Sequence, residues 1–141
     1  MEYKFIARIF EINQHDLEDI NALLPQLSER ARVLNFRALN AVLEHGYFLI
    51  ARDTRIVGTA TLVPVIIPMV RSGRIEDVVV DRNWRGCGIG KTLIEHLLKK
   101  ARELGMHHVD LTSNPRRTEA NQLYPALGFK LFTTNNYRYT L

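Results

Sequence analysis

A cluster of glycines beside basic residues is the strongest chemical signal in the sequence. Residues 85–91 read Arg-Gly-Cys-Gly-Ile-Gly-Lys and follow an apolar run of three valines at 78–80. Apolar residues recur at helical spacing from Ile89 onward, so the glycines stand where a buried strand gives way to a helix. The first N–H groups of a helix have no partner within it and carry the positive end of its dipole. Because glycines let a phosphate approach such a backbone closely, we predict a diphosphate-binding turn here.

Two well-known phosphate-binding motifs do not match this turn. A Walker A loop needs four residues between its glycines, but only three separate Gly86 from Gly90. The dinucleotide fingerprint needs a glycine at position 91, which is a lysine. The alternative is a glycine-rich helix entry that binds no ligand, although three glycines at a helix start are costly.

The spacing of Arg85, Gly88 and Gly90 resembles the coenzyme A signature of the GNAT superfamily of N-acetyltransferases. The resemblance covers most of the chain and is most specific over residues 74–129. It implies acetyl-CoA as the co-substrate, without a metal, and a strand that splays from its neighbour at a bulge. Pantetheine then lies in the gap and binds strand backbone, and the glycine turn binds the pyrophosphate. The cofactor-binding residues that the resemblance implies are Val78, Val79, Val80, Arg85, Gly86, Cys87, Gly88, Ile89, Gly90, Lys91, Asn121 and Tyr124.

A second part of the same signature follows further along the chain. Asn121 and Tyr124 lie three residues apart, in a predicted helix that closes with Gly128 and Phe129, so both can face one cleft. The resemblance implies that Tyr124 lies beside the sulfur of the cofactor and protonates the leaving thiolate as a general acid. The alternative is a tyrosine that packs the short helix on the sheet.

Glu76 and Asp77 are adjacent carboxylates in an otherwise apolar strand, where charged residues are rarely buried. Acetyl transfer needs a neutral amine, and an ammonium group with a pKa of about 10 is only roughly 0.1% neutral near pH 7. A carboxylate can take that proton. This strand is very similar to that of glucosamine-6-phosphate N-acetyltransferases within the superfamily, where a Glu-Asp pair lies in the substrate site. The likeness implies Glu76 as the base or as the residue that positions a water, and Asp77 as the substrate orienter. The alternative is a structural ion pair with Arg74, Arg8 or a neighbouring strand.

The elements that position these residues follow from the pattern of apolar residues. Short alternating or continuous apolar runs predict strands, and apolar stripes at helical spacing predict helices. Pro64 and Pro68 place the segment between them at a sheet edge or in a loop, because proline donates no ladder hydrogen bond. We expect strands at 3–11, 47–51, 56–63, 74–80, 108–112, 129–134 and 137–139, and helices from a cap at Asp16 to 27, and at 36–45, 89–104 and 119–127.

The order of these elements predicts an α/β fold with one parallel strand–helix–strand unit at 74–112. The resemblance implies the GNAT fold, with a mixed, mostly antiparallel sheet, a splayed central parallel strand pair and flanking helices. A length of 141 residues predicts a single domain that spans 1–141. The sequence shows no apolar run of membrane-spanning length and no secretory signal, and its single cysteine suits a reducing compartment, so we expect a cytoplasmic protein.

These observations together predict an acetyl-CoA-dependent N-acetyltransferase that acts on a primary amine of a small molecule by direct attack, with an amino sugar phosphate as a candidate. The net charge of +4 favours anionic partners. We expect acetyl-CoA and the amine as partners, no membrane and no nucleic acid, and the family alone suggests a homodimer. Three alternatives stay open: acetylation of a protein N-terminus or lysine, acetylation of aminoacyl-tRNA, and a non-catalytic domain that binds acetyl-CoA.

Overall fold

The computed structural model describes residues 5–141, which form a five-stranded sheet in the order β1-β2-β3-β4-β5. The first three neighbouring pairs are antiparallel, and β4 and β5 are parallel. This is the mixed, mostly antiparallel sheet that the sequence predicts. The strands are β1 (Phe5–Arg8), β2 (Tyr47–Arg52), β3 (Ile56–Ile66), β4 (Arg71–Val80) and β5 (Val109–Asp110).

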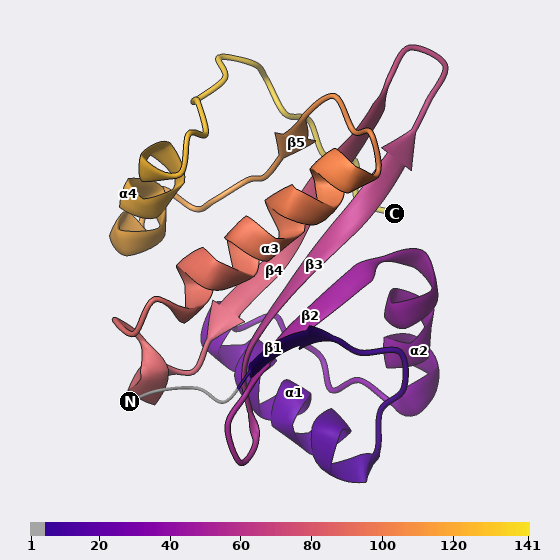
Figure 1. Ribbon diagram of the computed structural model, residues 1–141, viewed down its shortest axis with the longest axis vertical. Helices are drawn as coiled ribbons and strands as arrows, with labels where there is room; N and C mark the ends of the chain where they lie inside the picture. The colour runs from indigo at the N-terminus through magenta and orange to yellow at the C-terminus, as the bar shows by residue number, and fades with distance from the viewer. Residues whose placement is uncertain (1–4) are drawn as a thin grey trace.

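Helices cover both faces of the sheet, with α3 on one face and α1 and α2 on the other (Figure 1). The parallel β4–α3–β5 unit matches the predicted crossover. The helices are α1 (Gln14–Leu27), α2 (Phe36–His45), the short 3-10 helix η1 (Arg82–Trp84), α3 (Ile89–Glu103) and α4 (Thr118–Ala126).

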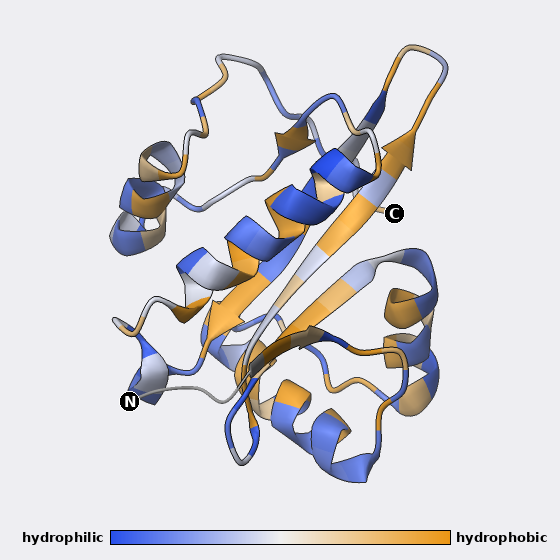
Figure 2. Cartoon of the chain, viewed as in Figure 1, coloured by the Kyte–Doolittle hydropathy of each residue, from blue (hydrophilic) through white to orange (hydrophobic). Residues whose placement is uncertain are grey.

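The helix α3 is positioned by the apolar stripe that predicted it. Leu93, Ile94 and Leu97 are fully buried against the sheet, while the opposite side of the helix is charged (Figure 2). Burial of side chains of this size stabilises the fold by about 2 kcal/mol each. Since α3 is held along its whole length, its N-terminus, where the glycines lie, is held as well.

The predicted start of α1 at Asp16 was wrong by one turn. Asn13 is the N-cap: its side-chain oxygen accepts a hydrogen bond from the N–H of Asp16 at 2.9 Å. Asp16 is the third residue of the helix, completes the capping box and forms an ion pair with Arg52 at 2.8 Å. A capping box satisfies two free N–H groups at once, which favours the earlier start.

The hairpin of β3 and β4 is longer than the sequence predicts and reaches past the end of β2. Pro64 lies within β3, opposite Gly73, and β2 pairs with β3 only as far as Leu62. Pro64 therefore stands where β3 has a free edge, as its missing N–H requires.

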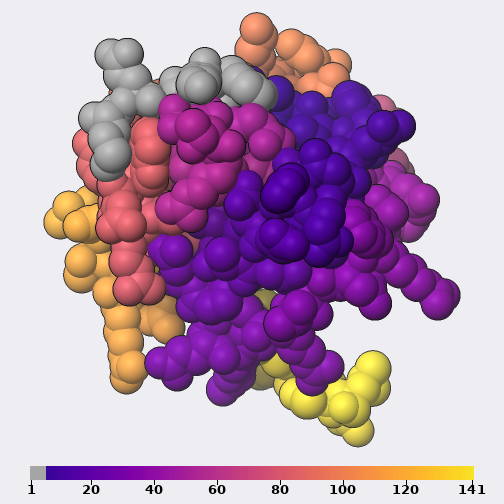
Figure 3. All heavy atoms as spheres, turned by 90° about the horizontal axis from the view of Figure 1, so that it is seen from below, coloured from indigo at the N-terminus to yellow at the C-terminus, as the bar shows by residue number. Residues whose placement is uncertain are grey.

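The predicted strand pair at 129–134 and 137–139 is absent: residues 127–141 contain no strand. Leu131, Phe132 and Tyr137 are at least 78% exposed, and the last residues stand out from the body of the molecule (Figure 3). A two-stranded hairpin is marginal by itself and needs a sheet edge on which to pair. The edge strand β5 has only two residues, fewer than the predicted 108–112, and therefore offers few backbone groups for a further strand to pair with.

The first predicted strand, 3–11, is also shorter, since β1 ends at Arg8. The part of that prediction at residues 3 and 4 lies outside the described residues.

Candidate functional site

The glycine turn lies between β4 and α3, as the sequence predicts. Gly86 and Gly88 have φ angles of +79° and +80°, in the left-handed region that other residues avoid. A Cβ placed on either glycine would meet no atom within 4 Å, so the surface above the turn is open. Gly88 is the N-cap of α3 and supplies no side-chain hydrogen bond to it. The first N–H groups of α3 therefore face solvent without a side-chain cap, where an anion can bind them.

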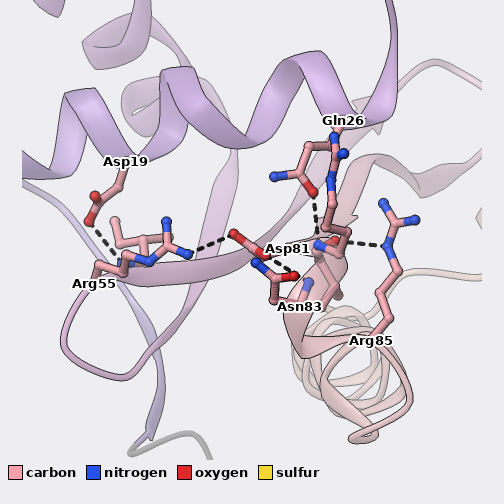
Figure 4. Close-up of polar contacts among 9 residues, drawn as sticks. Asp19, Gln26, Arg55, Asp81, Asn83 and Arg85 are labelled. Atoms are coloured by element: carbon pink, nitrogen blue, oxygen red, sulfur yellow. Dashed lines mark hydrogen bonds and ion pairs between the residues drawn. The ribbon is translucent and has the colours of Figure 1, made fainter.

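A buried carboxylate holds the entry to this turn. Asp81, which directly follows β4, is 4% exposed and accepts hydrogen bonds from the N–H of Asn83 at 2.9 Å and from Arg55 at 3.0 Å (Figure 4). Gln26 of α1 accepts a hydrogen bond from the N–H of Arg82 at 2.8 Å. These contacts join α1 and the β2–β3 turn to η1, so they position the turn from outside its own sequence. The sequence analysis did not predict these contacts. The one local indication of them is an aspartate, Asp81, directly after an apolar strand.

The basic residues of the turn have different partners. Arg85 is exposed, and its Nε donates a hydrogen bond to the carbonyl oxygen of Val80 at 3.1 Å. Lys91 lies 3.7 Å from Glu95 one turn along α3, an exposed pair of small energetic weight. Cys87 is partly buried, and its sulfur lies 3.9 Å from the carbonyl oxygen of Arg85.

The strand β4 has an unpaired edge next to the turn. Its pairing with β5 is confined to Gly73 with Val109 and Arg74 with Asp110, so the two strands separate beyond Arg74. A bulge at Asp77, where φ is +51°, shifts the register against β3. The N–H of Asp81 points to β3, where it binds the carbonyl oxygen of Val57.

Because successive residues alternate along a strand, the N–H groups of Val78 and Val80 point to the opposite, open edge. The side chain of Val79 is buried against α1, and that of Ile89 is buried against the sheet. Those two residues can therefore offer a ligand only their backbone. The open edge of β4, the helix η1 and the glycine turn follow one another directly over residues 76–91.

The two carboxylates of β4 have different surroundings. Glu76 pairs with Thr61 in the ladder, faces α1 and α2, and forms an ion pair with Arg74 at 2.9 Å in which both side chains are about 40% exposed. Asp77 reaches solvent at the bulge. Partial burial, and secondarily the adjacent charge of Glu76, raises the pKa of Asp77 above its ordinary value. The pair therefore includes one carboxylate with a cationic partner and one that takes up a proton more readily.

Tyr124 on α4 joins the apolar cluster that contains α3. It is 8% exposed, and its ring meets the edge of Phe129 at 5.8 Å between centroids. Val78, Val80 and Cys87 pack against the same cluster. Tyr124 therefore lies on the same face of the sheet as the side chains of Val78 and Val80. Burial raises the pKa of Tyr124, and the nearby charge of Arg117 opposes this only in part. The phenol therefore keeps its proton at neutral pH.

Asn121 has a structural role in this arrangement. Its amide nitrogen donates to the carbonyl oxygens of Asn114 and Arg117, each at 2.9 Å, which ties the loop after β5 to α4. Ser113 in the same loop has a buried hydroxyl oxygen without a hydrogen-bond partner in the described part of the chain. Such a group costs stability unless a ligand or water satisfies it. No motif in the sequence pointed to Ser113.

Residues 5–141 offer neither a cluster of metal ligands nor a membrane-spanning helix. Within this range no group of three or more His, Cys, Asp or Glu side chains comes close enough to hold a metal ion. None of the helices in the same range has the length and hydropathy that a membrane crossing requires.

The chain belongs to the acetyltransferase (GNAT) family, which matches residues 7–129. Members of this family use acetyl-CoA as a co-substrate. The glucosamine 6-phosphate N-acetyltransferase of Trypanosoma brucei brucei is 43% identical over 81 residues, which is 54% of this chain and 52% of that protein. The human N-acetyltransferase 8B is 34% identical over 86 residues, 60% of this chain and 38% of that protein. The chain therefore spans about half the length of these relatives or less.

Solved structures show the same fold over almost the whole chain. An acetyltransferase of Trypanosoma brucei has a TM-score of 0.79 at 28% identity and covers 97% of this chain and 99% of its own. An aminoglycoside acetyltransferase from an uncultured soil sample has a TM-score of 0.80 at 22% identity, over 97% of this chain and 95% of its own. The predicted GNAT fold is thus confirmed over almost the whole chain.

Proposed function

We propose that the protein transfers an acetyl group from acetyl-CoA to a primary amine of a small molecule by direct attack. One observation carries this proposal: the unpaired edge of β4 leads, through the single turn of η1, to the open glycine turn at the N-terminus of α3. An elongated ligand with amide groups along one part and a diphosphate at the other suits that arrangement.

The residues present fit acetyl-CoA in three places. The backbone of Val78 and Val80 offers strand-like hydrogen bonds to the amides of pantetheine, and the N–H groups of the turn suit the pyrophosphate. The unpartnered hydroxyl of Ser113 supplies a further polar group in the loop that follows β5. When bound, acetyl-CoA supplies an acetyl group in a thioester, which an amine nitrogen can attack.

Glu76 is proposed as the base. Its carboxylate accepts the proton that an ammonium substrate must lose, and Arg74 beside it pairs with the carboxylate form. Asp77 is proposed to orient the amine, and its raised pKa makes it the second candidate for the base. In the overall transfer a C–N bond forms and the C–S bond breaks.

Tyr124 is proposed as the general acid. Its buried phenol holds a proton at neutral pH and can donate it from the hydroxyl oxygen to the departing sulfur. The proton taken up by the carboxylate and the proton given by the phenol balance across the reaction. Both groups return to their starting states by exchange with solvent.

Amino sugar phosphates are the first acceptors to test, because the relative from Trypanosoma brucei brucei bears the name of such an enzyme. The cytoplasmic location and the homodimer stay predictions from the sequence. They enter no step of the proposed reaction.

A thiol-release assay with acetyl-CoA tests the proposal against amino sugar phosphates, arylalkylamines, polyamines, amino acids, aminoglycosides and short peptides. Turnover on one class of small amine is expected. Calorimetric binding of acetyl-CoA without turnover on any of them would overturn the small-molecule acceptor in favour of a macromolecular acceptor or a non-catalytic domain. Absence of acetyl-CoA binding would overturn the proposed site itself.

A further inference from the structure

A hollow lies between α2 and the outer half of β3. It is open to solvent and offers about 300 Å³, a volume at the lower end of ligand pockets. Its floor is β3 and its wall is the last turns of α2. The lining residues are Ala41, Val42, His45, Gly46, Thr61 and Val63.

The hollow adjoins the proposed base through the sheet register. Thr61 and Val63, which line it, stand directly opposite Glu76 and Arg74 on β4. Residues opposite one another in an antiparallel pair share a face of the sheet, with Cβ atoms about 5 Å apart. An amine placed at Glu76 therefore has the hollow beside it, on the face that α1 and α2 cover.

The chemistry of the lining selects among possible acceptors. Lysine and arginine are absent from the six lining residues, and most of them present only carbon. His45 is the one titratable member and lies exposed at the end of α2. The nearest cation on the neighbouring strand, Arg74, is already paired with Glu76. A phosphate placed here would lose its hydration without gaining a charged partner.

The size of the hollow suits an aromatic or branched alkyl group. An enclosed cavity of about 150 Å³ is enough to hold benzene, and this open hollow has room for a ring against its apolar floor. We infer that the hollow receives the apolar part of the acceptor, so that the substrate class is a primary amine with an aromatic or branched alkyl group. The inference rests on the proposed function, because it places the amine at Glu76.

Filling the hollow from an exposed position tests the inference. Ala41 lines it and is exposed, so Ala41→Phe brings a ring into the space without disturbing the core. Ala38→Phe is the matched control: it makes the same change one turn earlier on α2, at an exposed position outside the lining.

The measurement is the ratio of kcat/KM for 2-phenylethylamine to kcat/KM for ethylamine, which lacks the apolar group. We expect a ratio of at least tenfold in the native chain and in Ala38→Phe, since even one methylene in an apolar pocket is worth roughly tenfold or more. Ala41→Phe should bring the ratio close to one. Val63→Thr, of nearly the same shape, should lower it severalfold. An unchanged ratio in both lining variants, or a preference for glucosamine 6-phosphate that Ala41→Phe leaves intact, would overturn the inference.

A binding measurement separates this inference from the proposed function. 2-Phenylethanol has the same ring without the amine, and its binding can be followed by amide chemical shifts of Gly46 and Thr61 without acetyl-CoA. Saturable shifts that Ala41→Phe abolishes and Ala38→Phe preserves support the pocket even if no amine is acetylated. Amine turnover without such shifts supports the transferase and overturns the pocket.

Discussion

The two ends of α3 allow the glycine turn to be tested against an internal control. Gly88 at the N-terminus has a φ of +80°, and Gly105 beyond the C-terminus has a φ of +70°. A Cβ on either residue would meet no atom within 4 Å, so backbone strain is the main cost of a substitution at either position. That strain is about 1–2 kcal/mol for a residue in the left-handed region. A domain of this size should lose roughly 4–8 °C of Tm in either variant.

The two variants should differ in ligand binding, because the 15 residues of α3 separate the glycines by about 22 Å. Gly88→Val places a side chain over the free N–H groups of the turn, where the pyrophosphate is proposed to bind. Loss of one hydrogen bond to a charged group costs about 1.5–3 kcal/mol, which corresponds to a Kd about ten to a hundred times weaker. Gly105→Val should bind acetyl-CoA as the native chain does.

Isothermal titration calorimetry with acetyl-CoA gives both dissociation constants, and thermal unfolding gives both stability losses. Equal stability loss with weakened binding only in Gly88→Val is the expected result. If both variants bind acetyl-CoA equally well, or are weakened equally, the glycine turn is not the binding site.

Three further predictions concern the proposed catalytic groups. Tyr124→Phe keeps the ring against its apolar neighbours but removes the proton, so kcat should fall about a hundredfold with the Kd for acetyl-CoA unchanged; a weakened Kd with kcat retained would make Tyr124 a packing residue. Glu76→Gln should reduce kcat/KM strongly at pH 7 and little near pH 10, where the amine is already neutral; a uniform loss across the pH profile would assign Glu76 to the ion pair with Arg74 alone. Asp77 has a raised pKa when folded, so its contribution to stability is present below its unfolded pKa and is lost as the pH rises through the folded value. Asp77→Asn should therefore raise Tm at neutral pH but not below the unfolded pKa. Asparagine tolerates a positive φ, so the substitution adds no backbone strain at either pH. An unchanged difference in Tm at the two pH values would refute the linkage.

The helices and the antiparallel strands were predictable because their signals are local. The stripe of Leu93, Ile94 and Leu97 specifies a helix that buries one side, and it does so wherever the helix docks. Glycines at 86 and 88 indicate a backbone conformation that other residues avoid, and both have positive φ angles in the structure. The conformation of the glycine turn was therefore predictable, while its role in cofactor binding stays a prediction.

Features that depend on distant segments were not predictable. Asp81 stands beside η1 in the sequence, but its partner Arg55 comes from the turn before β3, and Gln26 of α1 binds the same short helix. The prediction of strands at 129–134 and 137–139 was wrong for a related reason. An alternating pattern predicts a strand, but the strand forms only where a neighbouring sheet edge can pair with it. The edge strand β5 is two residues long.

By itself the sequence determined the order of the main elements, the left-handed glycine turn and the buried side of α3, because each rests on residues a few positions apart. Tertiary structure alone decided that β4 and β5 part beyond Arg74, that Thr61 stands opposite Glu76, and that a hollow lies between α2 and β3. Those relations join segments separated by tens of residues, and strand register and helix docking set them through the packing of the whole core.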